Sequence, residues 1–316
     1  MDSYDVLIIG GGGAGFTAAI YTSRAKLKTL LLEKLTPGGQ IALTDVVENY
    51  PGFPEGVTGA DISQRMEEQA KKYGTQIGYE EVTSIAKKGE RFEAATNKGS
   101  HSAKAVILAA GASFRTLGVP REKELTGRGV SYCATCDGAF FKGKNIIVIG
   151  GGDSALQEGL FLTRFVNHLD VVHRRDQLRA SPILQERARE NSKIGFIWDT
   201  VVTAIEGDQK VKGVRLKNVK TGKERPYPTD GVFVFIGHDP STGFLKNFVA
   251  FDDKGYVKTD ERLRTSVLGV FAAGEVRSGA VKQLVSACGE GCEAALEAQA
   301  YLEQLELAAH TKGGGG

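Results

Sequence analysis

The sequence lacks any hydrophobic run long enough for a membrane-spanning helix. No apolar stretch in its 316 residues approaches the roughly 18–20 residues that cross a bilayer. It also lacks a charge excess: 40 basic residues against 38 acidic ones leave a net charge of +2, too balanced for an electrostatic nucleic-acid binder. The N-terminus has neither the basic flank nor the apolar core of a signal peptide. We therefore expect a cytoplasmic protein that binds neither membrane nor nucleic acid.

The composition is that of a folded protein with two domains. Hydrophobic residues make up 41% of the chain and charged residues 25%, which provides enough apolar material for two cores at about 100–200 residues per domain. Disorder and a disulfide-stapled miniprotein are both excluded. Glycine is unusually frequent, with 41 residues of 316 against the usual ~7%. Most of these glycines follow apolar runs, where phosphate-binding turns occur.

The first 33 residues predict a strand, a glycine turn, a helix and a second strand. An apolar run at 4–9 precedes the glycines, residues 16–26 have helical spacing, and the strand at 29–32 ends at Glu33. Such a motif can be a plain tight turn. The flanking elements and the acid instead favour a dinucleotide site, with the pyrophosphate at the helix N-terminus and the acid on a ribose hydroxyl. The candidate residues are Gly10, Gly12, Gly13, Ala14, Gly15 and Glu33.

The same unit recurs in the middle of the chain. A strand at 145–149 is followed by a second glycine turn, a helix to about residue 165 and a strand at 169–172. Each unit also has a later apolar strand that ends in glycine, at 106–111 and at 232–237. The candidate residues added by these segments are Gly150, Gly152, Asp153, Ser154, Ala155, Gly111 and Gly237.

A last strand and turn at 270–275, leading into a C-terminal helix, belong to neither complete unit. We therefore predict an α/β protein with two Rossmann-like domains, the second inserted into the first, as in two-dinucleotide-binding flavoproteins. The FAD-binding domain is expected at 1–113 and 245–316, and the NADPH-binding domain at 114–244. Both crossings contain Gly, Ser, Thr or Pro, as linkers do.

The end of the second strand distinguishes the two nucleotides. Counting 23 residues from Gly10 gives Glu33, and counting 23 from Gly150 gives His173. Arg174 and Arg175 come next, and Arg179 follows one helical turn later. A carboxylate would repel a 2′-phosphate, whereas guanidinium groups would bind it. A solvated basic turn is the alternative. We predict NADPH in the inserted domain and FAD in the other, because a flavin can accept the hydride of NADPH and pass on two electrons.

Cys133 and Cys136 are the expected electron acceptors. Two thiols separated by two residues can form a disulfide, and Asp137 is a candidate acid for protonating a departing thiolate. A zinc site that also uses Cys288 and Cys292 is an alternative. We favour close packing for these two cysteines and expect no metal.

The chain resembles the low-molecular-weight, bacterial-type thioredoxin reductases, class II of the pyridine nucleotide-disulfide oxidoreductases. The matching segments are GGGGAG (10–15), PGGQ (37–40), ENYPG (48–52), CATCDG (133–138), IGGGDSA (149–155), HRRDQLR (173–179) and VFAAGEV (270–276). The resemblance implies a homodimer that passes electrons from NADPH through FAD and the Cys133–Cys136 disulfide to thioredoxin. It also implies flavin contacts at Gly39, Gln40, Val47, Asn49, Gly274, Glu275, Gln283 and Leu284.

Two positions depart from the family pattern. Glu275 stands where the family usually has Asp, and Cys288 stands where a small residue without a thiol is expected. The alternative function is that of a related flavin-dependent dithiol oxidase or reductase, acting on a small-molecule disulfide or on another thioredoxin-like protein.

Overall fold

The computed structural model describes residues 2–34, 36–44 and 46–313. The chain forms two compact units. The first unit comprises residues 1–113 and 239–316, and the second comprises residues 114–238. The chain therefore leaves the first unit once, builds the second, and returns to complete the first.

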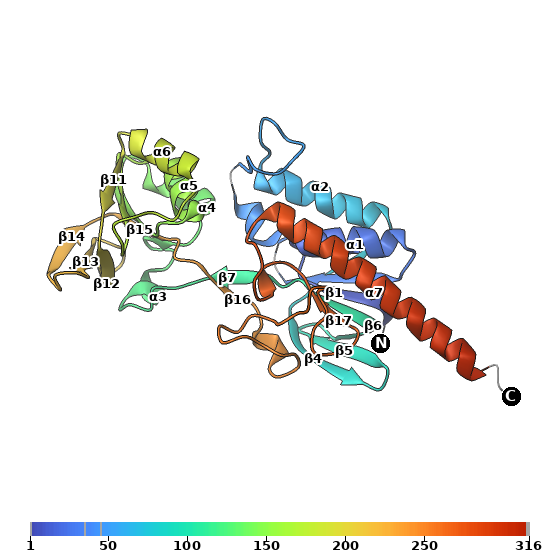
Figure 1. Cartoon of the computed structure of the whole chain (residues 1–316). Helices are drawn as coiled ribbons and strands as arrows, with labels where there is room; N and C mark the ends of the chain where they lie inside the picture. The colour runs from blue at the N-terminus through green and yellow to red at the C-terminus, as the bar shows by residue number, and fades with distance from the viewer. Residues whose placement is uncertain (1, 35, 45, 314–316) are drawn as a thin grey trace. The chain divides into compact units, whose positions relative to one another are not determined.

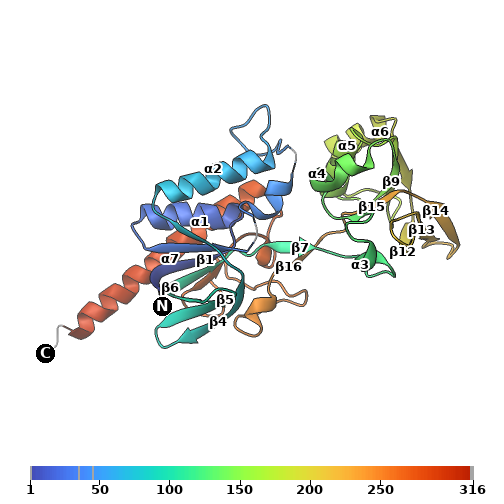
Figure 2. The same cartoon turned by 180° about the vertical axis from the view of Figure 1, so that it is seen from behind.

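The first unit is built on a seven-stranded sheet with the order β3-β2-β1-β6-β5-β4, and β17 pairs with β6 (Figure 1). Strands β1, β2, β3, β6 and β17 are parallel to one another, whereas β5 pairs antiparallel with β6 and β4 antiparallel with β5. Figure 2 shows this antiparallel extension, strands β4 and β5, next to β6. The elements of the first unit are β1 (Asp2–Ile9), α1 (Gly13–Arg24), β2 (Thr29–Glu33), η1 (Gly39–Leu43), α2 (Gly59–Lys72), β3 (Gln76–Tyr79), β4 (Val82–Lys88), β5 (Arg91–Thr96), β6 (Ser100–Leu108), η3 (Gly243–Leu245), β17 (Val270–Ala272), η4 (Gly274–Val276) and α7 (Leu284–Gly313).

Both faces of the sheet are buried at the second half of β1, which explains why residues 6–9 form a continuous apolar run. Successive side chains of a strand point to opposite faces. Val6 and Ile8 pack with helices α1, α2 and α7, while Leu7 and Ile9 pack in a second core with residues that follow the return of the chain, such as Val257. Helix α1 lies between α2 and α7 on the first face (Figure 1).

The second unit repeats this plan on a smaller scale. A five-stranded parallel sheet has the order β11-β10-β9-β15-β8, and a three-stranded antiparallel sheet has the order β12-β13-β14. Helices α5 and α6 cover one face of the parallel sheet, and residues of β12 and β13 cover the other. The elements are α3 (Glu122–Leu125), β8 (Val130–Ser131), α4 (Ala134–Asp137), η2 (Gly138–Phe141), β9 (Asn145–Ile149), α5 (Asp153–Leu162), β10 (His168–Val172), α6 (Pro182–Glu190), β11 (Ile194–Ile197), β12 (Thr200–Glu206), β13 (Gly213–Asn218), β14 (Glu224–Pro228) and β15 (Gly231–Val234).

The two crossings between the units are short strands that pair with each other. Strand β7 (Ala112–Phe114) leads into the second unit, and β16 (His238–Pro240) leads out of it. The backbone N–H of Arg115 also donates to the carbonyl of Gly237 at 2.9 Å. The chain thus enters and leaves the second unit at one place.

Among the helices that the structure describes, none combines the length and the apolar character needed to span a bilayer.

Candidate functional site

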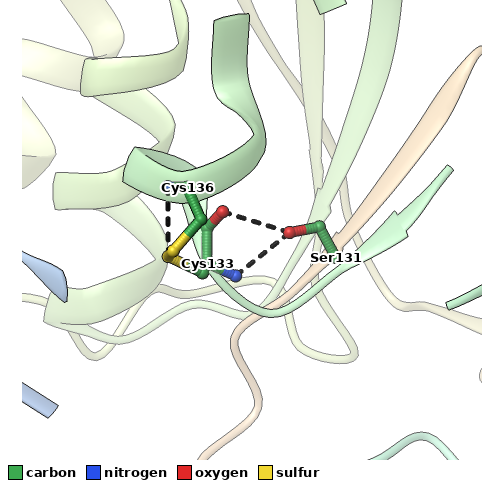
Figure 3. The surroundings of a disulfide bond; sticks show 3 residues. All are labelled: Ser131, Cys133 and Cys136. Atoms are coloured by element: carbon green, nitrogen blue, oxygen red, sulfur yellow. Dashed lines mark hydrogen bonds between the residues drawn. A yellow bond between two sulfur atoms is a disulfide. The ribbon is translucent and has the colours of Figure 1, made fainter. Parts of the chain in front are cut away.

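The two cysteines of the C-A-T-C segment form a disulfide in the second unit (Figure 3). Their Cα atoms are 5.4 Å apart. Cys133 is the N-cap of α4, and its Sγ accepts a 3.1 Å hydrogen bond from the backbone N–H of Cys136. After reduction, the same N–H would stabilise a thiolate on Cys133, because hydrogen bonds to charged acceptors are the stronger ones.

Ser131, which is buried in β8, fixes the backbone of the first cysteine (Figure 3). Its Oγ donates to the carbonyl of Cys133 at 3.1 Å and accepts from the N–H of Cys133 at 3.1 Å. The sequence reasoning missed Ser131. Its only signal is a hydroxyl two residues before the first cysteine.

Helix α4 is seated against α5, the helix that follows the second glycine turn. Ala134 is fully buried, and a Cβ on Gly138 would lie 3.0 Å from Cδ2 of Leu162. Asp137 ends α4, and its backbone N–H donates to the carbonyl of Cys133 at 3.3 Å. The disulfide and the second glycine turn are therefore parts of one packed unit. The role of the Asp137 carboxyl as an acid stays a prediction.

The two glycine turns begin in the same way. Gly10 has a φ of +110° and Gly150 a φ of +150°, a region that favours glycine. A Cβ on Gly10 would overlap the carbonyl oxygen of Ala109, and one on Gly150 would overlap that of Phe235. In each unit the turn therefore lies against the chain just beyond a neighbouring strand, β6 or β15.

In each unit, the second glycine of the turn contacts the residue at the end of the second strand, the position that distinguishes the two nucleotides. The backbone N–H of Gly11 donates to Oε2 of Glu33 at 2.8 Å. In the second unit, a Cβ on Gly151 would lie 2.5 Å from Nδ1 of His173. Glu33 and His173, each 23 residues after the first glycine of its turn, therefore occupy equivalent places in the two units.

The first turn fits a pyrophosphate. Gly12 is the N-cap of α1, no side chain caps the helix, and its first turn contains no acidic residue. The first N–H groups of a helix have no partner within it, and they favour an anion. A Cβ on Gly39 would lie in ordinary contact with Cα of Gly12, at 3.8 Å. Gly39 therefore lies beside the N-terminus of α1, where it leaves the backbone accessible to a phosphate.

The other candidate flavin contacts are held by residues from several segments of the first unit. Nδ2 of Asn49 donates to Oε1 of Gln283 at 2.8 Å, and Leu284 approaches Gly13 so closely that a Cβ there would lie 2.5 Å from its Cδ1. Three further contacts place the remaining candidates: Gln40 donates to the carbonyl of Ala112 at 3.1 Å, Val47 pairs with Val57, and the carbonyl of Gly111 accepts from the N–H of Ser241. Loops from four parts of the chain thus meet in one unit.

Glu275 carries a buried carboxylate oxygen with no hydrogen-bond partner among the described residues. Burial raises the pKa of this carboxyl, and Lys282 opposes the shift. The turn that holds it is fixed by Glu290, which accepts from the N–H of Gly274 at 2.7 Å and forms an ion pair with Arg277. An unpaired buried acceptor is costly. It would suit a hydroxyl donor such as the ribityl chain of FAD, so the residues present fit that group.

The second turn also fits a dinucleotide. Gly152 is the N-cap of α5, with no side-chain cap, and a Cβ there would meet nothing within 4 Å. Oδ1 of Asp153 accepts from the N–H of Ser181 at 2.6 Å, while Ser154 is exposed and Ala155 is buried behind the turn. Gly237, with a φ of +115°, ends the neighbouring strand region. The start of α5 therefore leaves space for a phosphate.

The three candidate arginines lie at a pocket. A cavity of about 330 Å³ is lined by Arg174, Arg175 and Arg179, together with Asp176, Asp199 and Lys220. His173 is buried, and burial together with the neighbouring arginines lowers its pKa, so its ring is neutral at pH 7. The positive charge of the pocket therefore comes from arginine and lysine. The sequence reasoning missed Asp199 and Lys220, which come from segments well beyond the arginine motif.

Cys288 and Cys292 are free thiols on α7. Cys288 is buried 3.3 Å from the place of a Cβ on Gly13, and a Cβ on Gly291 would overlap the carbonyl oxygen of Ala14. This part of α7 thus packs closely on α1. Within the described parts of the chain, no group of three or more His, Cys, Asp or Glu residues could hold a metal ion.

Comparison with known proteins gives consistent matches. Residues 4–291 match the family described as pyridine nucleotide-disulphide oxidoreductase. The chain is 49% identical over 304 residues to the thioredoxin reductase of Bacillus subtilis, covering 96% of each chain. Among solved structures, the thioredoxin reductase of Lactococcus lactis has a TM-score of 0.93 at 45% identity and covers 95% of this chain and 99% of its own. That of T. acidophilum has a TM-score of 0.91 at 38% identity, with 96% and 100% covered.

Proposed function

Because the chain belongs to the pyridine nucleotide-disulphide oxidoreductase family, with the two Rossmann-like domains predicted from its sequence, we propose that it is an NADPH-dependent flavoprotein that reduces the disulfide of thioredoxin. The enzyme is an oxidoreductase whose redox centre is the Cys133–Cys136 disulfide. The relatives named thioredoxin reductase match over nearly their full length, and this supports thioredoxin as the substrate.

The single observation that carries the proposal is the disulfide itself, closed at the start of α4 in the unit that also holds the arginine pocket. Structural disulfides are rare in reducing compartments, where a C-x-x-C is more often catalytic. The fixed N–H of Cys136 at Cys133 Sγ would serve the reduced state, in which a thiolate must be held ready.

Two cofactors complete the chemistry. When bound, NADPH would supply a hydride, and FAD would accept it and provide two electrons for the disulfide. The first glycine turn, with Glu33, Glu275, Asn49 and Gln283, would hold FAD. The second turn, with the three arginines of the pocket, would hold NADPH, and its 2′-phosphate would lie at the guanidinium groups.

The thiol chemistry then balances within the chain. A thiolate of the reduced Cys133–Cys136 pair attacks the disulfide of thioredoxin, and one thioredoxin sulfur leaves as a thiolate. The second cysteine of the pair attacks the mixed disulfide, so Cys133 and Cys136 are again joined and both thioredoxin sulfurs are reduced. Asp137, next to Cys136 in the chain, is the residue that we expect to donate a proton to a departing thiolate.

A homodimer is the assembly that we propose. The first unit presents apolar side chains on α1 and α7: Tyr21 is 39% exposed, Val285 45% and Leu296 52%. Such side chains on neighbouring helices suit a surface that a second copy covers. A cytoplasmic location is likewise proposed, because a dithiol that must be recycled works in a reducing compartment.

The test is a spectrum followed by an assay. The purified protein should show flavin absorbance that bleaches when NADPH is added, and the bleached protein should reduce thioredoxin catalytically. A dithiol oxidase would instead consume oxygen with a small-molecule dithiol and leave thioredoxin oxidised. A colourless protein with no NADPH turnover after FAD is supplied would rule out the proposal.

A further inference from the structure

The pocket in the second unit contains one cation that the arginine motif does not supply. Arg174, Arg175 and Arg179 follow β10, whereas Lys220 lies in the turn between β13 and β14. Asp176 and Asp199 line the same pocket. Six charged side chains from three segments therefore meet there, four of them positive and two negative.

Lys220 is placed by the backbone around it. The N–H of Val219 donates to the carbonyl of Asp199 at 2.7 Å, which ties the hairpin turn to the segment after β11. Within the turn, Oδ1 of Asn218 accepts from the N–H groups of Lys220 at 3.1 Å and of Thr221 at 2.9 Å. The base of the lysine side chain is thus fixed at the wall of the pocket.

The ammonium group of Lys220 bridges both carboxylates of the pocket. Nζ lies 3.0 Å from Oδ2 of Asp176 and 2.9 Å from Oδ2 of Asp199. The Lys220 side chain is 59% exposed and that of Asp176 is 64% exposed, while Asp199 is only 17% exposed. These bonds, first to Asp199 and then to Asp176, raise the pKa of Lys220, so the group stays protonated.

Removing Lys220 would take one positive charge from the pocket and would also leave two negative charges without their shared ion-pair partner. The three arginines and two aspartates would remain, and both carboxylates would face an arriving anion without a partner. A phosphate monoester carries about −1.5 to −2 charges at pH 7, and like charges brought together in a pocket oppose binding.

We propose that Lys220 is a further residue that selects the 2′-phosphate: it neutralises Asp176 and Asp199 at the pocket and contributes its ammonium group to the phosphate. The inference rests on the proposed NADPH function of this pocket and adds a determinant outside the arginine motif. Lysine binds phosphate as a compact point charge on a flexible stem. It can therefore keep one carboxylate contact while it turns toward a ligand.

Titration calorimetry of the flavin-loaded enzyme with 2′,5′-ADP and with 5′-AMP tests the proposal. The two ligands share the adenosine and the 5′-phosphate and differ only at the 2′ position. Lys220→Met should weaken 2′,5′-ADP about fivefold to tenfold, near the lower end for hydrogen bonds to charged groups because the pocket is open to solvent. Binding of 5′-AMP should change less than about twofold.

Lys223→Met is the matched control. Lys223 is an exposed lysine of the same hairpin, and it does not line the pocket. It should leave both ligands almost unchanged, and Lys220→Arg should retain most of the affinity for 2′,5′-ADP. Lys220→Met combined with Asp176→Asn should recover part of the loss, since one unpaired carboxylate is then removed. A lysine that only anchors the hairpin would not give this recovery.

The outcomes separate the two claims. If Lys220→Met and Lys223→Met have the same effect, or if Lys220→Met weakens both ligands equally, the role of Lys220 is overturned while the pocket stands. Arg175→Met tests whether the pocket binds the 2′-phosphate at all. If neither Arg175→Met nor Lys220→Met changes the affinity for 2′,5′-ADP, the proposed NADPH site is wrong as well.

Discussion

The carboxylate of Glu33 accepts a 2.8 Å hydrogen bond from the backbone N–H of Gly11, twenty-two residues earlier in the chain. The contact closes the end of β2 onto the first glycine turn. His173 lies against Gly151 in the same relation in the second unit, and three arginines follow at or near it. We propose that this difference, a carboxylate in the first unit and an arginine pocket in the second, decides that FAD binds the first unit and NADPH the second.

Truncation of Arg174 and Arg175 together to alanine should raise the KM for NADPH by well over tenfold. Hydrogen bonds to charged groups contribute about 1.5–3 kcal/mol each, and both would be lost at the 2′-phosphate. The KM for NADH should change little, because NADH lacks that phosphate. Steady-state kinetics with both coenzymes measure the effect, and equal losses with both would contradict the assignment.

Replacement of Cys133 or Cys136 by serine should abolish thioredoxin reduction. One remaining thiol cannot close the disulfide that completes the exchange with thioredoxin. Flavin reduction by NADPH should continue, since that step uses neither sulfur. Stopped-flow absorbance measures the flavin step and a coupled assay measures thioredoxin reduction. A single-serine variant with normal thioredoxin turnover would show that electrons take another path.

Glu275→Gln should stabilise the flavin-free protein at pH 8 and have little effect at pH 4. Burial raises the pKa of Glu275 in the folded state, so its favourable contribution is present below the unfolded-state pKa of about 4.3 and is lost as the pH rises through the folded-state pKa. Glutamine carries no charge at either pH and avoids this loss. Thermal unfolding midpoints across pH 4–8 record the difference, with the exposed Glu293→Gln on α7 as the control.

The same variant should reduce the stabilisation that FAD provides. A hydroxyl donor on the orphaned oxygen favours the ionised glutamate, so the wild-type protein gains more from bound FAD than Glu275→Gln does. Thermal midpoints with and without added FAD test this expectation. An identical FAD-dependent increase in both proteins would place Glu275 outside the flavin site.

Gly291→Ala should destabilise the first unit by about 1–3 kcal/mol, because its Cβ would overlap the carbonyl oxygen of Ala14 and force α7 away from α1. Gly289→Ala is the matched control two residues earlier in the same helix. It is exposed, and a Cβ there meets nothing within 4 Å. It should stabilise the helix by up to roughly 1 kcal/mol. Urea unfolding followed by circular dichroism compares the two, and equal effects would contradict the close packing.

The glycine turns and their strands could be predicted because a parallel strand buried on both faces appears in the sequence as an uninterrupted apolar run. The predicted ends of the helices and strands were less accurate. Helix α1 begins at Gly13 rather than at residue 16, since Gly13 and Gly15 at the end of the turn already belong to the helix and carry no apolar signal. Strand β6 begins at Ser100, well before the predicted start at 106, because its first half is mostly polar and gives no apolar signal, although it pairs with β5 on one side and with β1 on the other.

The arginines of the pocket could be predicted for a similar reason, as they follow their strand directly. Lys220 could not, because it reaches the pocket on the β13–β14 hairpin, which is placed by tertiary contacts such as the backbone hydrogen bond from Val219 to Asp199. Glu290 is a second example: it fixes the turn at Gly274 from the first turns of α7, sixteen residues further along the chain. Contacts of this kind have no local pattern.

The paired crossings β7 and β16 have a consequence for how such a chain could have arisen and could be rebuilt. The rings of Phe114 and His238, at the two ends of the second unit, are 5.3 Å apart. A segment whose ends are adjacent can be cut out, and a short loop can close the gap without stretching either side. We therefore expect the first unit to tolerate removal of the second unit, its replacement by a unit of another coenzyme specificity, or a circularly permuted copy in its place.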